Sequence, residues 1–582
     1  MYNINLNYRN QFSEGWQLAL LVALVLTPVW LGLLFYRFFL ETKGLNALWN
    51  NNFDSRLILW IFERNYLSLI NLPLSEFWNA NQFYPTKGSL AFSDSIIAGQ
   101  LVYLPMRLMG YTPLESLYLT FFVIIFFSTY LIVSIGHKIL QLTVMEWIIF
   151  CFICQFSLTA TNFLGHYQLF AFQLAPAFFL MLYSMLLLPT GQKLIGLTLL
   201  FITISSFATY FAPMSVSIVI IILTILLLFN RKKLLNILLS CSNYKASIII
   251  SAILLGLFFY VQLLPYVKIL GELPPQNMAE TKVYSAKLMS LINAPSPKSE
   301  IYKANIVNGY WEYSYFPGFV ILFGSLIGII FLIQTGEKDK KSLLVFMLIL
   351  SASALILSYG PYFKSSLLGQ EFIVPLPFYI LAKILPGFEN IRAPGRFGAF
   401  LTLPLAFFFI SAVKEIKITQ VRFLCVLIIF ALIIYDSRVT ARLHSFDSTI
   451  SPFYQKVKQV VNYREPTLIL PLHKDSHLNT ILNYMDQLHI SNQTGLWVVA
   501  GYGAKSTNAL HFYTDLSRQV AEKRIPIEQL FCQAKKDGIR NVITSPNFSI
   551  LSGQAREICN YELVINESNY MLYRLTINTT NN

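Results

Sequence analysis

Long apolar segments constrain the fold of this chain more than any other feature of its sequence. Segments of roughly 17–25 apolar residues are long enough to cross the hydrocarbon core of a bilayer. We mark eleven of them, near residues 16–36, 116–135, 144–161, 167–188, 194–212, 214–229, 247–269, 316–333, 343–359, 397–413 and 418–435. Only 12% of the 582 residues are charged, about half the share found in an ordinary soluble domain. The sequence therefore predicts an all-α polytopic membrane protein with about eleven transmembrane helices, and excludes a cytosolic enzyme, a disordered chain and a disulfide-built secreted domain.

The basic residues of the short loops indicate the orientation of these spans, because cytoplasmic loops are enriched in Lys and Arg. Loops after the second, fourth, sixth, eighth and tenth spans are basic, whereas the short loops 162–166 and 210–213 carry no Lys or Arg. We therefore expect a multi-pass membrane protein with a cytoplasmic N-terminus. Much of the net charge of +14 is then a topology signal, and no nucleic-acid partner is expected.

With this orientation, segments 37–115, 270–315 and 360–396 lie outside, together with the tail 436–582. The apolar runs of the tail shrink to strand length, at residues 467–472, 541–544 and 570–575, and residues 517–536 have a helical pattern. We predict a transmembrane domain over 1–435 and a small extracytoplasmic α/β domain over 436–582.

The cysteines give two expectations. Cys151 and Cys154 are three residues apart inside a span, where small apolar packing is the expected role. Cys532 and Cys559 both belong to the tail, and they can form a disulfide if that compartment is oxidising.

Two acidic residues stand out in the first outside segment. Asp54 follows the first span and precedes an apolar stretch, 57–69, that is too short to cross the membrane and that predicts an interfacial helix. Asp94 lies in Ser93-Asp94-Ser95, ahead of a second apolar segment, 96–109, which we expect to be partly immersed. Both are candidate catalytic residues, because ionisable groups confined to one face of a membrane protein indicate function. The alternative is a solvated loop carboxylate for Asp54 and a helix N-cap for Asp94.

Further polar groups occur on the same predicted face. Arg392 and Arg396 lie four residues apart at the start of a span, and their guanidinium groups suit a phosphate through paired donors. His166 and Gln168 enter the fourth span from outside, and Glu312 precedes the eighth. The alternative for the arginines is a snorkelling anchor, and for His166 an ordinary interfacial histidine.

Several short motifs, taken in their order along residues 16–435, resemble the C-type superfamily of integral-membrane glycosyltransferases (GT-C). The resemblance is closest to bacterial members that carry a trailing extracytoplasmic domain, and it implies a location in a bacterial inner (plasma) membrane. The motifs are the first-loop acid Asp54, the segments 77–85 (FWNANQFYP), 90–94 (LAFSD), 165–168 (GHYQ), 316–318 (FPG), 357–361 (LSYGP) and 386–388 (PGF), and the arginine segment 391–397 (IRAPGRF).

The resemblance implies an inverting hexosyl- or pentosyltransferase that moves a sugar from a polyprenyl-phosphate donor to a cell-envelope glycan, lipid or protein acceptor on the extracytoplasmic face. It implies that Asp54 is the catalytic residue. In this reaction Asp54 would act as the base that accepts the proton of the acceptor hydroxyl. Arg392 and Arg396 would bind the donor phosphate, and His166, Gln168 and Glu312 would contribute to substrate binding. A Mg²⁺ or Mn²⁺ ion held by Asp54 and Asp94 would suit these carboxylates.

The sequence departs from the family in one respect. Members often carry two adjacent acids in the first loop, whereas Ser55 follows Asp54 here. Asp94 is then the second acid, or catalysis uses one acid, or activity has been lost.

Other functional classes remain open at this point. A transporter or flippase of a lipid-linked saccharide is one, but transporters place polar groups at the bilayer midplane, whereas the spans here are almost free of charge. A polymerase or ligase of surface polysaccharide and a non-catalytic scaffold are the others.

Overall fold

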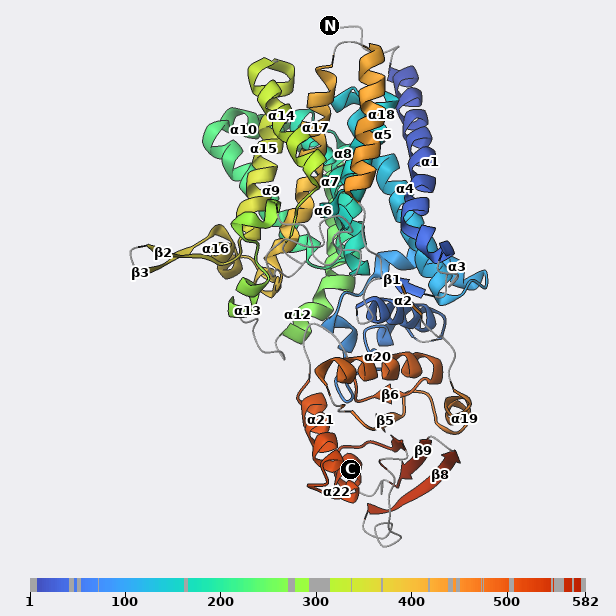
Figure 1. Ribbon diagram of the computed structural model, residues 1–582. Coiled ribbons are helices and arrows are strands. Elements are labelled where there is room, and N and C mark those ends of the chain that lie inside the picture. The colour runs from blue at the N-terminus through green and yellow to red at the C-terminus, as the bar shows by residue number, and fades with distance from the viewer. Residues whose placement is uncertain are drawn as a thin grey trace. The chain divides into compact units, whose positions relative to one another are not determined.

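The computed structural model describes residues 8–40, 47–49, 54–71, 73–161, 166–270, 278–292, 314–335, 338–367, 370–416, 419–437, 443–445, 451–472, 474, 476–501, 507–545, 548, 559–567 and 570–576. This part of the chain is mostly helical, with a small sheet near the C-terminus (Figure 1). The prediction of a helical membrane protein with a C-terminal α/β region is confirmed at that level. The chain divides into two compact units, Met1–Gly44 with Tyr118–Val261 and Pro274–Leu443, and Leu45–Leu117 with Gln262–Leu273 and His444–Asn582.

Helices make up most of the first unit, and each of the eleven apolar segments predicted to cross the membrane coincides with helical structure. The elements are α1 (Tyr8–Leu40), α4 (Pro113–Leu140), α5 (Val144–Phe156), α6 (Leu158–Thr161), η4 (Tyr167–Leu174), α7 (Ala175–Leu187), α8 (Gly191–Phe207), α9 (Phe211–Phe229), α10 (Arg231–Ser242), α11 (Lys245–Phe258), η5 (Phe259–Leu263), α13 (Met278–Val283), η6 (Leu288–Leu291), α14 (Phe319–Thr335), α15 (Lys338–Ser358), α16 (Pro377–Ile384), η8 (Phe388–Asn390), η9 (Pro394–Leu401), α17 (Thr402–Lys414) and α18 (Thr419–Asp436). A hairpin of β2 (Tyr362–Leu367) and β3 (Gln370–Pro375) joins α15 to α16.

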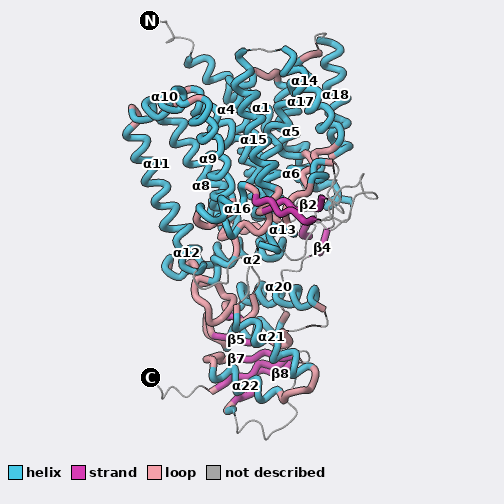
Figure 2. Tube along the Cα trace, turned by 90° about the vertical axis from the view of Figure 1, so that its left-hand side faces the viewer, coloured by secondary structure: helices cyan, strands magenta, loops and turns pink. Residues whose placement is uncertain are grey.

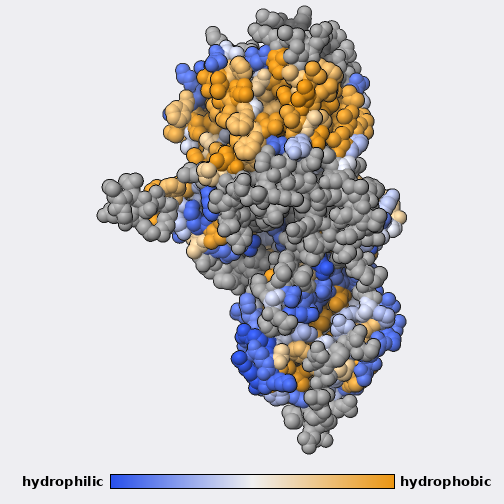
Figure 3. Space-filling model, viewed as in Figure 1, coloured by the Kyte–Doolittle hydropathy of each residue, from blue (hydrophilic) through white to orange (hydrophobic). Residues whose placement is uncertain are grey.

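Six helices of the described chain are long and apolar enough to cross a membrane. They are Pro113–Leu140, Tyr167–Leu187, Phe211–Phe229, Lys245–Ile269, Lys341–Ser358 and Pro394–Lys414, and four shorter helices are also apolar. Hydrophobic side chains cover much of the described face of this unit in Figure 3, whereas hydrophilic ones predominate on the C-terminal domain. These features establish a multi-pass membrane protein, and the number eleven stays a prediction.

Local sequence signals explain where several helices begin. Thr143 and Glu146 form a capping box at the start of α5, and the Thr190 side chain accepts a hydrogen bond from the Lys193 backbone at the start of α8. Such caps satisfy backbone N–H groups that the first helical turn leaves without partners. Proline occupies the first turn of α7 and of η9, where its missing N–H costs nothing.

Two stretches of 3₁₀-helix lead into the most buried helices of the first unit. η4 and η9 each contain eight residues and run directly into α7 and α17, although 3₁₀ runs longer than about four residues are uncommon. Phe172 of η4 and Phe400 of η9 pack against each other with ring centroids 5.7 Å apart, and Phe211 of α9 contacts both rings. These three aromatic rings hold η4, η9 and the start of α9 together.

The second unit contains the predicted C-terminal domain together with segments from the first predicted outside loop. Its elements are β1 (Ala47–Trp49), α2 (Asp54–Asn71), η1 (Leu74–Glu76), η2 (Ser89–Phe92), η3 (Ile97–Gly99), α3 (Gln100–Leu108), α12 (Leu264–Leu270), β4 (Leu443–Ser445), α19 (Pro452–Val460), β5 (Pro466–Ile469), α20 (His477–Thr494), β6 (Trp497–Val498), α21 (Asn508–Ala521), α22 (Ile527–Lys536), β7 (Asn541–Thr544), β8 (Tyr561–Glu567) and β9 (Tyr570–Leu575).

The sheet of the C-terminal domain has five strands in the order β6-β5-β7-β9-β8. β5 pairs in parallel with β6 and β7, and β9 pairs antiparallel with β7 and β8. Helices α20, α21 and α22 connect the parallel strands (Figures 1 and 2). The three predicted strands are confirmed. The helical pattern predicted over 517–536 corresponds to the end of α21 and the whole of α22, and the chain turns between Ala521 and Ile527.

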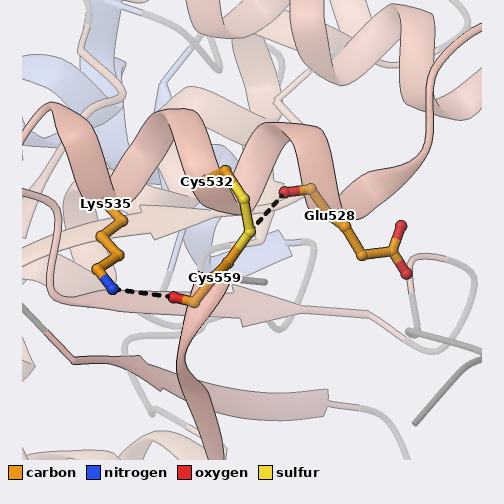
Figure 4. Close-up of a disulfide and its surroundings, with 4 residues drawn as sticks. All are labelled: Glu528, Cys532, Lys535 and Cys559. Atoms are coloured by element: carbon orange, nitrogen blue, oxygen red, sulfur yellow. Dashed lines mark hydrogen bonds between the residues drawn. A yellow bond between two sulfur atoms is a disulfide. The ribbon is translucent and has the colours of Figure 1, made fainter. Parts of the chain in front are cut away.

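A disulfide joins Cys532 of α22 to Cys559, just before β8, with the two Cα atoms 5.2 Å apart (Figure 4). The Lys535 ammonium donates to the Cys559 carbonyl oxygen at 3.3 Å, which adds a second link between α22 and the strand. The pairing that the sequence left open is therefore present. Cys151 and Cys154 are both fully buried and free, as expected for packing residues.

Residues 81–84 extend the sheet of the C-terminal domain by pairing with its β6 segment. The Tyr84 backbone N–H donates to the Val498 carbonyl at 3.1 Å, and the Val498 N–H donates to the Asn81 carbonyl at 3.3 Å. The Trp497 indole N–H donates to the Gln82 carbonyl at 3.1 Å. The motif segment 77–85 is thus part of the scaffold of this unit.

Helix α2 is covered on more than one side. The six consecutive residues 57–62 are all buried, and α2 packs against both α3 and α20. Arg56 forms an ion pair with Asp486 of α20 at 2.6 Å, and the Asn492 side chain donates to the Trp60 carbonyl at 3.0 Å. The stretch 57–69 is helical as predicted, but its apolar residues face protein, and only Leu69 and Ile70 at its end are well exposed.

Candidate functional site

Asp54 is the first residue of α2 and is half-buried. A carboxylate in the first helical turn interacts favourably with the backbone N–H groups and the helix dipole there. The same first turn is held in place, because Arg56 pairs with Asp486 of α20 at 2.6 Å. Asp54 thus lies at a fixed helix terminus. This position is compatible with stabilisation of the first helical turn and with the role of a catalytic base.

Asp94 is buried, with 4% of its surface exposed, and the residues on both sides of it are held by hydrogen bonds. The Ser95 carbonyl accepts from the Asn65 side chain at 2.7 Å, and the Ser95 hydroxyl accepts from Gln262 at 2.7 Å. The Tyr266 hydroxyl donates to the Ser93 carbonyl at 2.8 Å. The backbone that carries this carboxylate is therefore fixed by α2 on one side and by residues 262–266 on the other.

The prediction that Asp94 caps a helix is wrong. The next helical element, η3, has Ile96 as its N-cap, and α3 has Gly99, and neither end has a side-chain capping bond. Ile96 has a left-handed backbone with φ of 52°, a conformation that β-branched residues rarely adopt. This turn separates Asp94 from the helix that follows, so Asp94 is not the N-cap residue of that helix.

Asp54 and the residue of α2 that binds next to Asp94 lie far apart along this helix. Asn65, which binds the carbonyl next to Asp94, is eleven residues beyond Asp54, about 16 Å along a helix axis at 1.5 Å per residue. Among the described residues, no three or more His, Cys, Asp or Glu side chains gather in a way that could hold a metal ion. A shared Mg²⁺ or Mn²⁺ site of Asp54 and Asp94 finds no support in these contacts.

Arg396 is the most buried cation of the candidate set. It belongs to η9 and is 6% exposed, and its guanidinium carbon lies 5.0 Å from the centre of the Tyr210 ring. Gly395, its neighbour, donates through its backbone N–H to the Tyr284 carbonyl at 3.1 Å. The arginine segment is therefore attached to two other segments of the first unit.

Arg392 and Lys282 lie on the same segments. The Arg392 guanidinium carbon is 4.9 Å from the centre of the Tyr284 ring, and a long contact of 3.9 Å joins it to Glu280. The Lys282 ammonium donates to the Tyr359 carbonyl at 3.2 Å, and partial burial lowers the pKa of Lys282. Arg392 keeps 39% of its side chain exposed, so solvent screening leaves its ion pair with Glu280 weak.

His166 and Gln168 lie at the start of η4 and are 5% and 7% exposed. Gln168 precedes Phe172 by four residues, as Arg396 precedes Phe400, and the two phenylalanines are in contact. Tyr210, over which Arg396 lies, directly precedes Phe211 of the same aromatic group. The structure therefore places Tyr210 and Arg396 beside each other, and we call the residues Tyr210, Lys282, Arg392 and Arg396 the cationic cluster.

The predicted site residues belong to two units. Asp54 and Asp94 are in the second unit, whereas His166, Gln168, Arg392 and Arg396 are in the first. Glu312 lies outside the described residues.

Several motif glycines have a structural reason. Gly318, Gly360 and Gly387 have positive φ angles of 102°, 77° and 80°, which favour glycine. A Cβ on Gly398 would lie 2.6 Å from the Tyr315 ring. Part of the motif pattern thus reflects turns and close packing rather than chemistry.

Sequence reasoning missed Lys282, Tyr210 and Tyr284. Lys282 lies in the predicted outside segment 270–315, so its charge was a usable signal. The two tyrosines were not recognisable, because nothing in their local sequence shows which arginine they face.

No family model matches this chain, and no curated protein is significantly similar to it.

Proposed function

We propose that the protein is a membrane glycosyltransferase that transfers a sugar from a polyprenyl-phosphate donor to a cell-envelope acceptor on the extracytoplasmic face. The donor phosphate binds at the cationic cluster of the first unit. The resemblance assigns the role of base towards the acceptor hydroxyl to a carboxylate of the first outside segment, and Asp54 and Asp94 are the two candidates.

The single observation that supports the proposal best is the arrangement of Arg392 and Arg396. Each guanidinium lies over a tyrosine ring, Tyr284 and Tyr210 respectively, at 4.9 and 5.0 Å. Such contacts restrict the orientation of the planar fork of donors that recognises a phosphate through two parallel bonds. Both arginines precede the apolar helix Pro394–Lys414 or open it, where a lipid-linked phosphate would meet the protein.

The chemistry requires two functions that these residues can provide. The leaving polyprenyl phosphate gains negative charge in the transition state, and fixed cations stabilise that charge. The acceptor hydroxyl must lose its proton, which a positioned carboxylate can accept. Asp94 is buried and held through both neighbouring serines, so it fits the second function at least as well as Asp54.

The disulfide Cys532–Cys559 supports the proposed location of the C-terminal domain. Disulfides persist in oxidising compartments and are rare in the cytosol, and this one lies in the second unit. It agrees with the orientation derived from the basic loops, which places residues 436–582 in the periplasm and the N-terminus in the cytoplasm.

Binding of the donor phosphate can be tested with the full-length protein in nanodiscs and a polyprenyl monophosphate as the probe. We expect saturable binding of the probe by the wild type. The affinity of Arg396→Lys and of Arg392→Lys should be weaker by about tenfold or more, because lysine offers a point charge instead of a planar fork of donors. Arg540→Lys is the matched control, because Arg540 is exposed and lies in the C-terminal domain.

Two further probes separate the possible sources of binding. The corresponding uncharged polyprenol should bind more weakly than the monophosphate, and an anionic phospholipid should not compete at equal concentration. If both lysine variants bind like the wild type, the arginines are interfacial anchors and the proposal loses its supporting observation. Movement of the intact lipid-linked saccharide across the bilayer without sugar transfer would instead favour a flippase.

A further inference from the structure

The function proposed above assigns no role to two buried amide oxygens in the region of Asp94. Asn65 is fully buried, and its amide nitrogen donates to the Ser95 carbonyl at 2.7 Å. A carbonyl oxygen can only accept, so this bond fixes which end of the amide faces Ser95. The Asn65 Oδ1 atom then points elsewhere, and no group in the described part of the chain hydrogen-bonds to it.

Gln100, at the start of α3, repeats this arrangement. It is 5% exposed, and its amide nitrogen donates to the Phe62 carbonyl at 3.1 Å. Again the partner is an acceptor, so the orientation of the amide is fixed. The Gln100 Oε1 atom is buried and receives no hydrogen bond from any described residue.

These two oxygens and Asp94 belong to one small region of the second unit. Phe62 and Asn65 are three residues apart and thus share a face of α2. Asp94 adjoins Ser95, whose carbonyl contacts Asn65 at 2.7 Å. α2 packs directly against α3, which carries Gln100. Three residues with oxygen acceptors in their side chains therefore lie on α2 or on segments that contact it, and one of them carries a carboxylate.

We propose that Asp94, Asn65 and Gln100 bind a hard divalent cation of the Mg²⁺, Mn²⁺ or Ca²⁺ class. Such ions take carboxylate and amide oxygens as ligands, and a cation would satisfy the two buried oxygens, which otherwise carry the cost of desolvation without a bond. The site excludes Asp54, whose helix position is about 16 Å away along α2, and it does not depend on sugar transfer.

The surroundings of this site agree with a bound cation. Arg64 of α2 donates to the Asn79 carbonyl at 2.8 Å and Arg107 of α3 pairs with Glu63 at 2.9 Å, so these two guanidinium groups are held by other acceptors. The turn that follows Asp94 is strained at Ile96, which is fully buried with φ of 52°. Strained backbone persists where the surrounding contacts determine it, often at binding sites.

The test uses full-length protein in nanodiscs, freed of metal with a chelator and titrated with Mn²⁺. Electron paramagnetic resonance counts the bound ions, and thermal unfolding reports stability with and without Mn²⁺. We expect one saturable Mn²⁺ per chain and a higher unfolding midpoint when it is bound. Asp94→Asn and Gln100→Ala should each weaken binding by about tenfold or more, whereas Asp54→Asn should bind like the wild type.

A gain-of-function variant distinguishes a ligand from a residue that only supports the fold. Gln100→Glu loses its bond to Phe62 and should therefore unfold at a lower temperature without metal. It adds a carboxylate to the site, so Mn²⁺ should bind more tightly and raise its midpoint more than it does in the wild type.

Three results would overturn the assignment. The first is that the wild type shows no saturable Mn²⁺ binding, in which case the two oxygens bind ordered water. The second is that Asp94→Asn and Gln100→Ala bind Mn²⁺ as the wild type does. Loss of binding in Asp54→Asn, with Asp94→Asn unaffected, would place the ion elsewhere.

Discussion

At the scale of single residues, Asp94 differs from an ordinary loop carboxylate in how completely its position is specified. It is buried, it is not a helix cap, and Asn65, Gln262 and Tyr266 hold the serines beside it. A carboxylate held in this way can act on a substrate or on a bound ion without first being ordered.

Asp94→Asn should therefore reduce sugar transfer by about 10²-fold or more, because the amide cannot accept a proton at neutral pH. The measurement is turnover of a radiolabelled polyprenyl-phosphate sugar in isolated membranes, with immunoblotting to equalise protein level. Asp515→Asn, an exposed position on α21, is the control and should keep the wild-type rate. A normal rate for Asp94→Asn would exclude Asp94 as the base and leave Asp54 as the candidate for that role.

His489 of α20 gives the second unit a predictable response to pH. Burial, with the nearby Arg56 charge as a lesser cause, lowers the pKa of His489 to about 3, whereas an unfolded histidine titrates near 6.5. Between these values the unfolded state binds the extra proton, so stability is fully present above about pH 6.5 and is lost as the pH falls towards 3.

The unfolding midpoint of the wild type should therefore decrease from about pH 7 to about pH 5, and His489→Gln should flatten this dependence. Burial raises the pKa of the neighbouring Asp486, whose titration acts in the opposite sense, so the difference between wild type and variant is the quantity to measure. Parallel pH profiles for the two proteins would contradict the assignment to His489.

At the scale of elements, the link between the first-loop segments and the C-terminal domain depends on Arg464. Its guanidinium donates to the Glu76 carboxylate at 2.6 Å and to the Asn79 carbonyl at 2.6 Å, and it lies 5.2 Å from the centre of the Trp497 ring. Arg64 of α2 donates to the same Asn79 carbonyl at 2.8 Å. One loop carbonyl thus joins α2 to the C-terminal domain.

Arg464→Ala should lower the free energy of unfolding of this unit by about 1.5–3 kcal/mol, because hydrogen bonds to charged partners are lost. Tryptophan fluorescence during denaturant unfolding provides the measurement, since Trp497 is beside the mutated residue. Arg540→Ala removes a more exposed arginine with a 3.8 Å ion pair and should cost about 0–1 kcal/mol. Equal effects of the two substitutions would show that the Arg464 contacts contribute little.

The elements that the sequence predicted well are those whose signal is local. Apolar length identified the helices of the first unit, and short apolar runs identified β5, β7 and β9. α2 was predicted as an interfacial helix, because its own pattern cannot show that α20, more than 400 residues later, covers it. Residues 81–84 offered no signal of their pairing with β6, since strand pairing between distant segments depends on the partner. The candidate site was predictable in its charged residues but not in Tyr210, Tyr284 or the amides of Asn65 and Gln100.

At the scale of the whole molecule, the predicted topology places 37–115 and 436–582 outside and the basic loop 231–245 inside. A membrane-impermeant thiol reagent applied to intact cells should label a cysteine introduced at Phe512, an exposed residue of the C-terminal domain. It should not label one at Leu235, which is equally well exposed in α10, until the membrane is permeabilised. Labelling of Leu235→Cys in intact cells would reverse the orientation and remove the argument for chemistry on the outer face.

The central claim, transfer of a sugar from a polyprenyl phosphate, is tested most directly by mass spectrometry of cell-envelope glycans. The comparison uses a strain that lacks the gene, complemented with the wild type, Asp54→Asn, Asp94→Asn or the control Asp515→Asn. We expect the deletion strain and the double variant Asp54→Asn/Asp94→Asn to lack one sugar residue and to accumulate the lipid-linked donor. The wild type and the control should restore the full glycan. A complete glycan profile in the double variant, at wild-type protein level, would contradict the central claim.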